Sequence, residues 1–216
     1  EETALAASIE GRPGLPRVRP PYMAARGLFG KPTVVNNVKT LAYVPLIIRN
    51  GAAWFQETGT MTSPGTAVFA LAGKVVNTGL VEAPLGTTLR DVIFTAGSGV
   101  PKGKRFKAVQ IGGPSGGCLP EEKLDMPVDY DSLRQAGAIM GSGGMVVLDE
   151  DDCMVEMARY FLEFTQRESC GTCTFCRLGT KQMLAILTDI TQGKGTMEDL
   201  ERLEELAAEI KDGSLC

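Results

Sequence analysis

Three cysteines stand three residues apart in the stretch ESCGTCTFCR, and a fourth cysteine stands at position 216. Cys170, Cys173 and Cys176 form the pattern C-x2-C-x2-C, and Cys216 comes shortly after the helix breaker Gly213. Thiolates at this spacing, on a loop that turns into a helix, can reach three corners of one [4Fe–4S] cube, and a distant cysteine can supply the fourth ligand. The four cysteines therefore predict an iron–sulfur site.

Two other uses of these thiols are less well matched by the spacing. A four-cysteine zinc site normally presents two separated C-x2-C pairs. Disulfides are disfavoured by the close spacing and by the lack of a secretory signal. The sequence contains no histidine, so Cys–His and Ser–His–Asp catalysis, histidine-bound zinc and Rieske clusters are excluded. Cys118 and Cys153 lie outside the pattern, and we expect each to be a small buried hydrophobic residue.

Polar residues before one expected helix are a second candidate site. Asn36 and Asn37, in TVVNNVKT, are the residue types that cap helices or form turns, and a cofactor contact is the less expected role from spacing alone. Glu1 and Glu2 are favourable charges for a first helical turn. The glycine-rich stretches IGGPSGG and GSGG lack the Lys–Ser/Thr ending of a phosphate loop, so we expect turns there.

Composition limits the possible partners and compartments. The 216 residues contain 22 Lys and Arg against 26 Asp and Glu, and the net charge of −4 gives no reason to expect nucleic acid. The apolar runs are too short to cross a bilayer, so we expect no direct membrane insertion. The chain opens without a basic and apolar leader, and we expect a cytoplasmic protein.

Periodicity predicts an α+β protein. A short helix over residues 1–10 and a proline-rich segment lead to a helix through Leu41, Val44 and Ile48, despite Pro45. From about residue 61 the pattern becomes strand, strand, short helix capped at Thr87 or Thr88, and strand, which is the outline of a small β-grasp module. Further strands are expected in MPVDYDSL and GGMVVLD.

The last third of the chain is expected to be a helical bundle. Apolar residues recur at helical intervals in three successive stretches that follow Asp149. The second of these helices is expected to end at Gly193, and the third is expected to begin at a Thr196 cap and end at Gly213. Three amphipathic helices with short links favour a bundle that carries the cysteine loop between its first two helices.

Three motifs in order, EETALAASIEG, PTVVNNVKTL and ESCGTCTFCR followed by SLC, resemble one flavoprotein family. It includes the NADH-binding subunit of respiratory complex I and the diaphorase-type subunits of NAD(P)-linked hydrogenases, [FeFe]-hydrogenases among them, and formate dehydrogenases. The resemblance runs over essentially all 216 residues but corresponds to the later part of a family member. IGGPSGGC and MGSGGMVVLDE are closer to the hydrogenase and formate dehydrogenase branch.

The resemblance implies three domains. Residues 1–60 correspond to the end of a Rossmann-like FMN domain, residues 61–148 to a soluble-ligand-binding β-grasp domain, and residues 149–216 to a [4Fe–4S]-binding helical bundle. The implied ligands of the cluster are Cys170, Cys173, Cys176 and Cys216. The implied contacts to FMN and to the nicotinamide nucleotide are Glu1, Glu2, Tyr22, Val35, Asn36, Asn37 and Thr40.

The resemblance also implies a function. A nicotinamide nucleotide, NAD(H) or NADP(H), exchanges hydride with FMN, and electrons pass singly between the flavin and the cluster. Expected partners are a thioredoxin-like [2Fe–2S] subunit and an iron–sulfur-rich catalytic subunit of the hydrogenase or formate dehydrogenase type. The alternative is an electron-transfer or scaffold module that holds one cluster and has no nucleotide chemistry of its own. A structural zinc protein is the third possibility.

Overall fold

The computed structural model describes residues 2–216, and these divide into two compact units. One unit combines residues 2–41 with residues 153–216, and the other consists of residues 42–152. The first unit begins with helix α1 (Glu2–Ile9), as the sequence predicts, and Gly11 follows it with a φ of +77°. Such a left-handed conformation is ordinary for glycine and ends the helix.

The linking helix α2 (Val38–Asn50) extends from the first unit into the second, and α3 (Ala52–Gln56) follows it. Pro45 lies inside α2, where it leaves one backbone acceptor without its helical donor. The side-chain oxygen of Asn37 accepts a hydrogen bond from Lys39 N at 2.8 Å. Asn37 therefore satisfies one of the donors that the start of α2 leaves free.

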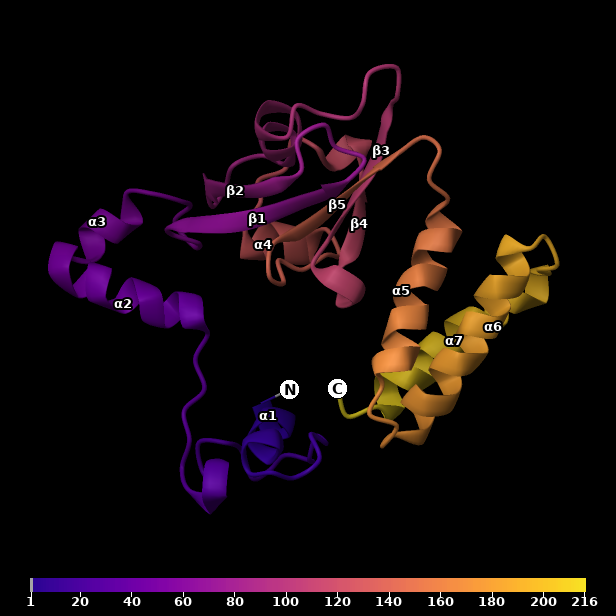
Figure 1. Cartoon of the computed structure of the whole chain (residues 1–216), viewed down its shortest axis with the longest axis horizontal. Coiled ribbons are helices and arrows are strands. Elements are labelled where there is room, and N and C mark those ends of the chain that lie inside the picture. Colours follow the sequence, from indigo (N-terminus) through magenta and orange to yellow (C-terminus); the bar gives the residue numbers. More distant parts are fainter. Residues whose placement is uncertain (1) are drawn as a thin grey trace. The chain divides into compact units, whose positions relative to one another are not determined.

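A mixed sheet of five strands forms the second unit (Figure 1). The order of the strands is β2-β1-β5-β3-β4; β1 and β5 run parallel, and every other neighbouring pair is antiparallel. The strands are β1 (Thr66–Gly73), β2 (Gly79–Pro84), β3 (Phe106–Ile111), β4 (Gly117–Pro120) and β5 (Gly144–Asp149). The parallel pair joins the first and last strands of the unit. Two segments that are far apart in the sequence are therefore hydrogen-bonded neighbours inside the sheet.

The core of this unit lies against one face of the sheet. Phe69, Met145 and Val147 point into it from β1 and β5, and all three are fully buried. A π-helical turn, Asp91–Ala96, contributes Val92 and Ile93 to the same cluster. Its first turn is capped by Thr88, whose hydroxyl accepts from Asp91 N at 3.1 Å, whereas Thr87 bonds to Pro84. Of the two expected caps, Thr88 is the one that forms.

The strand expected in MPVDYDSL is wrong. In this stretch Pro127 makes only an isolated bridge to Thr88, and α4 (Tyr130–Gln135) follows. Asp129 begins that helix, because its carboxylate accepts from Ser132 N at 2.8 Å. A short apolar and polar stretch can form either a strand or a helix start, and the Asp129 cap decides for the helix.

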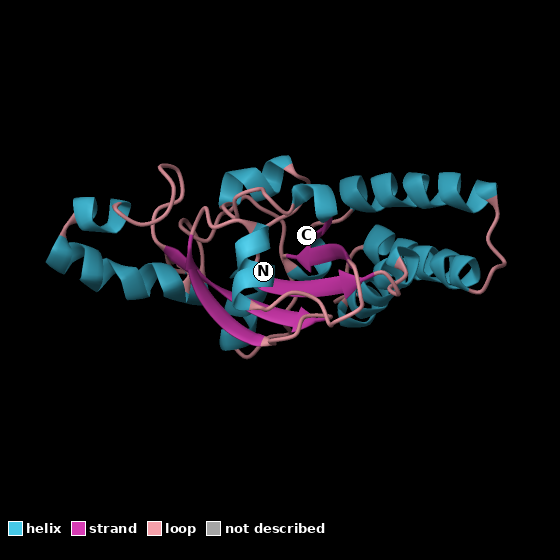
Figure 2. Cartoon of the chain, turned by 90° about the horizontal axis from the view of Figure 1, so that it is seen from above, coloured by secondary structure: helices cyan, strands magenta, loops and turns pink. Residues whose placement is uncertain are grey.

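Three helices complete the first unit, as expected from their periodicity. They are α5 (Met154–Glu168), α6 (Thr180–Thr191) and α7 (Met197–Gly213), and they lie side by side in Figures 1 and 2. Thr196 starts α7 through a reciprocal capping box with Asp199. No helix among residues 2–216 has both the length and the apolar character that crossing a membrane requires.

Candidate functional site

The loop between α5 and α6 holds the three closely spaced cysteines. Ser169 ends α5 in an extended conformation, and the helical turn Phe175–Gly179 leads into α6. The carbonyl of Cys173 accepts from Arg177 N at 2.9 Å, and the carbonyl of Cys176 accepts from the Thr180 hydroxyl at 2.6 Å. Cys170 therefore lies in the loop, whereas Cys173 and Cys176 lie where helical bonding begins.

Contacts across the loop hold its two ends together. The Arg177 guanidinium donates to the carbonyl of Gly171, and Gly171 has a φ of +74°, which favours glycine. Gly171 N in turn donates to the Ser169 hydroxyl at 3.2 Å. The loop is thus closed by polar contacts from both sides of Gly171.

Hydroxyl groups lie beside two of the sulfurs. Ser169 Oγ is 3.3 Å from Cys176 Sγ, and the Cys170 thiol donates to Thr172 Oγ1, also at 3.3 Å. The hydroxyl and the backbone N–H of Thr172 lower the pKa of Cys170 from its ordinary value, because both can donate to the sulfur once the thiol has lost its proton. Sequence analysis did not identify these two hydroxyls as contacts of the sulfurs, because only the fold brings Ser169 to Cys176.

The segment that carries Cys216 contacts this loop. Leu215 N donates to Cys173 Sγ at 3.4 Å. Ser214, one residue earlier, has a buried hydroxyl oxygen without a hydrogen-bond partner among the described residues. The fourth cysteine therefore follows directly on a residue that touches the second, although the two cysteines stand far apart in the sequence.

Two glycines let α7 approach the loop. A Cβ on Gly213 would overlap the ring of Phe175, and a Cβ on Gly179 would lie 2.6 Å from Ile210. Real Cβ atoms do not approach so closely, so a side chain at either position would force the Phe175 ring, the Ile210 side chain or α7 itself to move. The absence of these two side chains brings the end of α7 beside the cysteines.

The donor set suits an iron–sulfur cluster in its chemistry. All six cysteines are free; Cys170 and Cys216 are exposed, and Cys173 and Cys176 are half-buried. Among residues 2–216, no three His, Cys, Asp or Glu side chains converge as the ligands of one metal ion do. A [4Fe–4S] cluster binds four cysteine thiolates, each at a different iron, so its ligands need not converge on one ion.

Cys118 and Cys153, expected to be buried, are both exposed. Cys118 lies on β4, an edge strand, and Cys153 precedes the first turn of α5. That expectation is wrong, because Cys118 lies on the open face of β4, opposite to buried Leu119, and Cys153 lies just before α5 rather than on its packed face.

A second candidate region lies around α1 and the proline-rich segment. A cavity of about 310 Å³ is bordered by three of the residues that the resemblance assigns to cofactors, Glu2, Tyr22 and Val35. Its other lining residues are Arg19, Met23, Ala24, Thr33 and Val34. Glu1 lies outside the described residues. The fold therefore gathers residues from three separate stretches of sequence around one hollow.

The remaining assigned residues do not line this cavity. Asn36, Asn37 and Thr40 are all exposed at the start of α2, and Asn37 uses its side-chain oxygen as a cap. The structure therefore brings together part of the expected cofactor set and leaves the asparagine pair on a neighbouring open surface.

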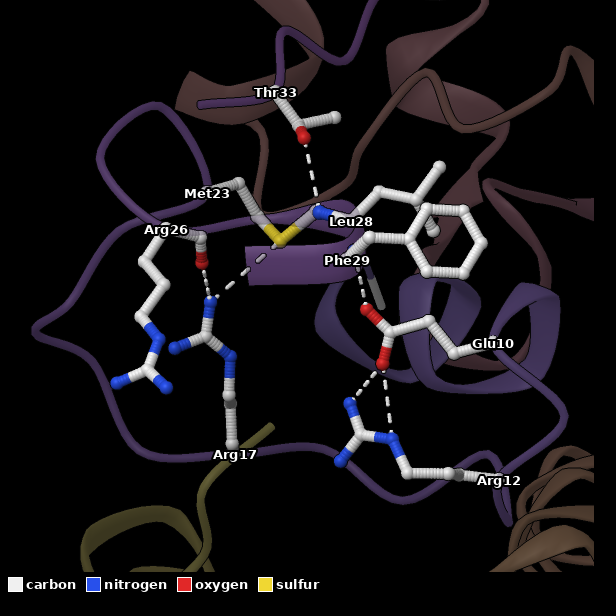
Figure 3. Close-up of polar contacts among 8 residues, drawn as sticks. All are labelled: Glu10, Arg12, Arg17, Met23, Arg26, Leu28, Phe29 and Thr33. Carbon is white, nitrogen blue, oxygen red and sulfur yellow. Dashed lines mark hydrogen bonds and ion pairs between the residues drawn. The ribbon is translucent and has the colours of Figure 1, made fainter. Parts of the chain in front are cut away.

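Hydrogen bonds from arginine side chains fix the conformation of the segment that carries Tyr22 (Figure 3). Glu10 accepts from Phe29 N at 2.6 Å and from Arg12 Nε at 2.9 Å. These contacts, first that from Arg12 and then that from Phe29, lower the pKa of Glu10 from its ordinary value. Arg17 donates to the carbonyl of Arg26, and these side chains border a second cavity of about 550 Å³.

These arginines were not among the residues predicted from the sequence. The sequence feature that could have identified them is the run RPGLPRVRPPYMAAR. Its prolines prevent regular secondary structure, so side-chain hydrogen bonds must fix the conformation of this segment.

Comparisons with known proteins agree with the motifs. Residues 156–216 match the NADH-ubiquinone oxidoreductase-F iron–sulfur binding region. The chain is 58% identical over 216 residues to the NADP-reducing hydrogenase subunit HndC of Solidesulfovibrio fructosivorans, covering 100% of this chain and 44% of that protein. It is 44% identical to the F 2 subunit of the NADH-quinone oxidoreductase of Rhizobium meliloti (strain 1021), covering 100% of this chain and 51% of that protein.

A solved structure is also similar. A crystal structure of an NAD+-reducing [NiFe]-hydrogenase in the H2-reduced state matches with a TM-score of 0.89 and 43% sequence identity, over 100% of this chain and 36% of that chain. The chain spans about half the length, or less, of the curated relatives that it matches. The family resemblance predicted from the motifs is confirmed: the chain is homologous over its whole length to part of NADH-quinone oxidoreductase F subunits and of a hydrogenase subunit, and residues 156–216 match the iron–sulfur binding region of the F subunits.

Proposed function

We propose that this chain is part of a flavoprotein subunit that oxidises NAD(P)H or reduces NAD(P)+ and exchanges the electrons through a [4Fe–4S] cluster. One observation carries the proposal: Leu215, next to Cys216, donates a hydrogen bond to Cys173 Sγ across 42 positions of sequence. The fold thereby joins the C-x2-C-x2-C loop to a fourth cysteine. Homology over the whole chain to NADH-quinone oxidoreductase and hydrogenase subunits supports the nucleotide and flavin part.

The four cysteines hold the cluster in this proposal, and the contacts around them position the ligands. Arg177 closes the loop on Gly171, and the close approach of α7 supplies Cys216. Glu1, Glu2, Tyr22, Val35, Asn36, Asn37 and Thr40 contact FMN and the nicotinamide nucleotide. When bound, FMN accepts electrons in pairs and passes them on singly. These side chains bind and orient, and none is required to act as a general acid or base.

The three regions have separate roles in the proposal. Residues 1–60 end the flavin domain, residues 61–148 are a β-grasp domain, and residues 149–216 are the cluster-bearing bundle. The strand order β2-β1-β5-β3-β4, with its parallel central pair, supports a β-grasp assignment. The match of residues 156–216 to the family's iron–sulfur region supports the bundle.

The chain works with other subunits. We propose a thioredoxin-like [2Fe–2S] subunit and an iron–sulfur-rich catalytic subunit of the hydrogenase or formate dehydrogenase type as partners. Identity of 58% to a subunit of an NADP-reducing hydrogenase, against 44% to a complex I type subunit, supports the hydrogenase branch. We place the assembly in the cytoplasm, because its electron carriers are the cell's own nicotinamide nucleotides.

Anaerobic purification of the complete gene product tests the cluster. We expect brown protein with about four irons and four sulfides for this site, and an EPR signal that appears on reduction with dithionite or NADH. Stoichiometric zinc without sulfide would overturn the proposal.

A second candidate is a cluster-bearing electron-transfer or scaffold module without nucleotide chemistry. The exposure of Asn36, Asn37 and Thr40 favours it for residues 1–216 alone, because open side chains do not enclose a flavin. Reduction of the cluster by dithionite but not by NADH, in a protein that contains bound FMN, would distinguish this module from the oxidoreductase.

A further inference from the structure

The hydroxyl of Ser169 contacts two groups of the cysteine loop. Its oxygen accepts a hydrogen bond from Gly171 N at 3.2 Å and lies 3.3 Å from Cys176 Sγ. A hydroxyl has one proton to donate and two lone pairs. Since Gly171 occupies a lone pair, the proton remains available for the sulfur.

The direction of the bond follows from the protonation of the sulfur. A cysteine that binds iron is a thiolate and has no proton. Cys176 in that form can only accept, so Ser169 is the donor. The bond is then assisted by the charge of the sulfur and is stronger than one between neutral groups.

The surroundings of Ser169 fix this geometry. Ser169 is half-buried at the end of α5, where its backbone is extended (φ −61°, ψ 132°). Cys176 lies in the helical turn that leads into α6, and Arg177 ties that turn back to the carbonyl of Gly171. The hydroxyl and the sulfur thus belong to two ends of one closed loop.

We propose that Ser169 is a positioning residue that sets the reduction potential of the cluster, by donating its hydroxyl proton to the Cys176 sulfur. The inference rests on the proposed function, since it takes Cys176 as a ligand. Reduction by one electron adds negative charge that the ligand sulfurs share. A hydrogen bond to a ligand sulfur stabilises the reduced form more than the oxidised form and raises the potential.

A matched control lies in the same loop. Thr174 stands between Cys173 and Cys176, but no hydrogen bond from its hydroxyl to a sulfur is present among the described residues. Thr174→Ala therefore removes a hydroxyl from the loop without removing a sulfur contact. Ser169→Ala removes a hydroxyl of the same kind together with the contact to Cys176.

The experiment is a redox titration of the complete gene product, purified anaerobically and followed by the EPR signal of the reduced cluster. We expect Ser169→Ala to make one-electron reduction about tenfold less favourable, which is a shift of ~59 mV to lower potential. Thr174→Ala is expected to keep the wild-type potential. An unchanged potential in Ser169→Ala, with wild-type iron and sulfide content, would overturn the inference.

A second pair of variants covers the case in which Ser169→Ala does not assemble a cluster. Ser169→Thr and Ser169→Val have nearly the same shape and differ in one hydroxyl. The Thr variant is expected to stay near the wild-type potential and the Val variant to fall below it; equal potentials would count against the inference. Iron and sulfide analysis of the wild type separates this result from failure of the proposed function, because a wild type without a cluster contradicts the latter.

Discussion

Cys173 has the most central sulfur of the candidate site, because Leu215 N contacts it from the segment of the fourth cysteine. We expect Cys173→Ser to weaken cluster binding by about tenfold or more, since even the loss of an outer partner of a ligand costs that much. Iron, sulfide and EPR measurements on anaerobic protein check this. Cys118→Ser is the control, because Cys118 lies on a different unit, and equal loss of iron in both variants would contradict the ligand set.

Thiol reactivity in the cluster-free chain is expected to follow the local environment of each cysteine. Thr172 lowers the pKa of Cys170, whereas partial desolvation of the sulfur raises the pKa of Cys118, although the residue as a whole is exposed. Cys170 is therefore a thiolate at lower pH and should react with iodoacetamide at lower pH than Cys118. Mass spectrometry of labelled peptides across a pH series measures this order. Thr172→Val should move the Cys170 profile to higher pH, and an unmoved profile would show that the threonine is not the cause.

Residue spacing alone predicts the set of four cysteines, but it carries no information about the contacts around them. Cys170, Cys173 and Cys176 are close in sequence, so local geometry fixes their relation. Ser169 and Cys176 meet only because Gly171 bends the loop, and a contact of that kind has no periodic signal. The residues expected to contact the flavin were named from the family resemblance. Without it, Asn36 and Asn37 cannot be told apart from ordinary helix-capping residues.

At the scale of elements, the turn before β5 depends on one glycine. Gly143 has a φ of +83°, and a Cβ there would overlap the carbonyl oxygen of Val68. We expect Gly143→Ala to lower the free energy of unfolding by more than ~1 kcal/mol. Urea unfolding followed by circular dichroism measures it. Gly144→Ala is the matched control, since open space surrounds that position and its φ is not left-handed; similar losses in both variants would argue against the clash.

The start of α7 gives a second prediction at this scale. Thr196→Ala removes the side chain that accepts from Asp199 N, and it should cost about 1 kcal/mol of stability. Thr196→Ser keeps the hydroxyl and should lose much less. Thermal unfolding of the two variants checks the difference, and identical midpoints would mean that the capping box does not contribute.

The helices were more predictable than the sheet. Apolar periodicity and caps located α5, α6 and α7, because helical bonding is local. Strand β4 was not predicted, because its four residues become a strand only by pairing with β3. Asp129 turned an expected strand into a helix start, since one cap outweighs a short alternation of apolar residues.

At the scale of the whole molecule, residues 1–216 match only part of their relatives, 44% of one and 51% of another. We expect these residues alone, supplied with FMN, not to reduce an acceptor dye with NADH, because the family's earlier flavin region is not in this sequence. A protein in which that region precedes residue 1 is the comparison and should be active. Dye reduction by residues 1–216 alone, measured anaerobically by absorbance, would overturn this expectation.

Gly213 has no side chain, and this allows the end of α7 to lie against Phe175 of the cysteine loop. A single methyl group at this position would overlap the ring of Phe175, so either the ring or the end of α7 would have to move. If the end of α7 moves, Leu215 N loses its contact with Cys173 Sγ, although every cysteine is still in the sequence. The contact between the two parts of the candidate site thus depends on a hydrogen atom at Gly213, where every other residue has a carbon.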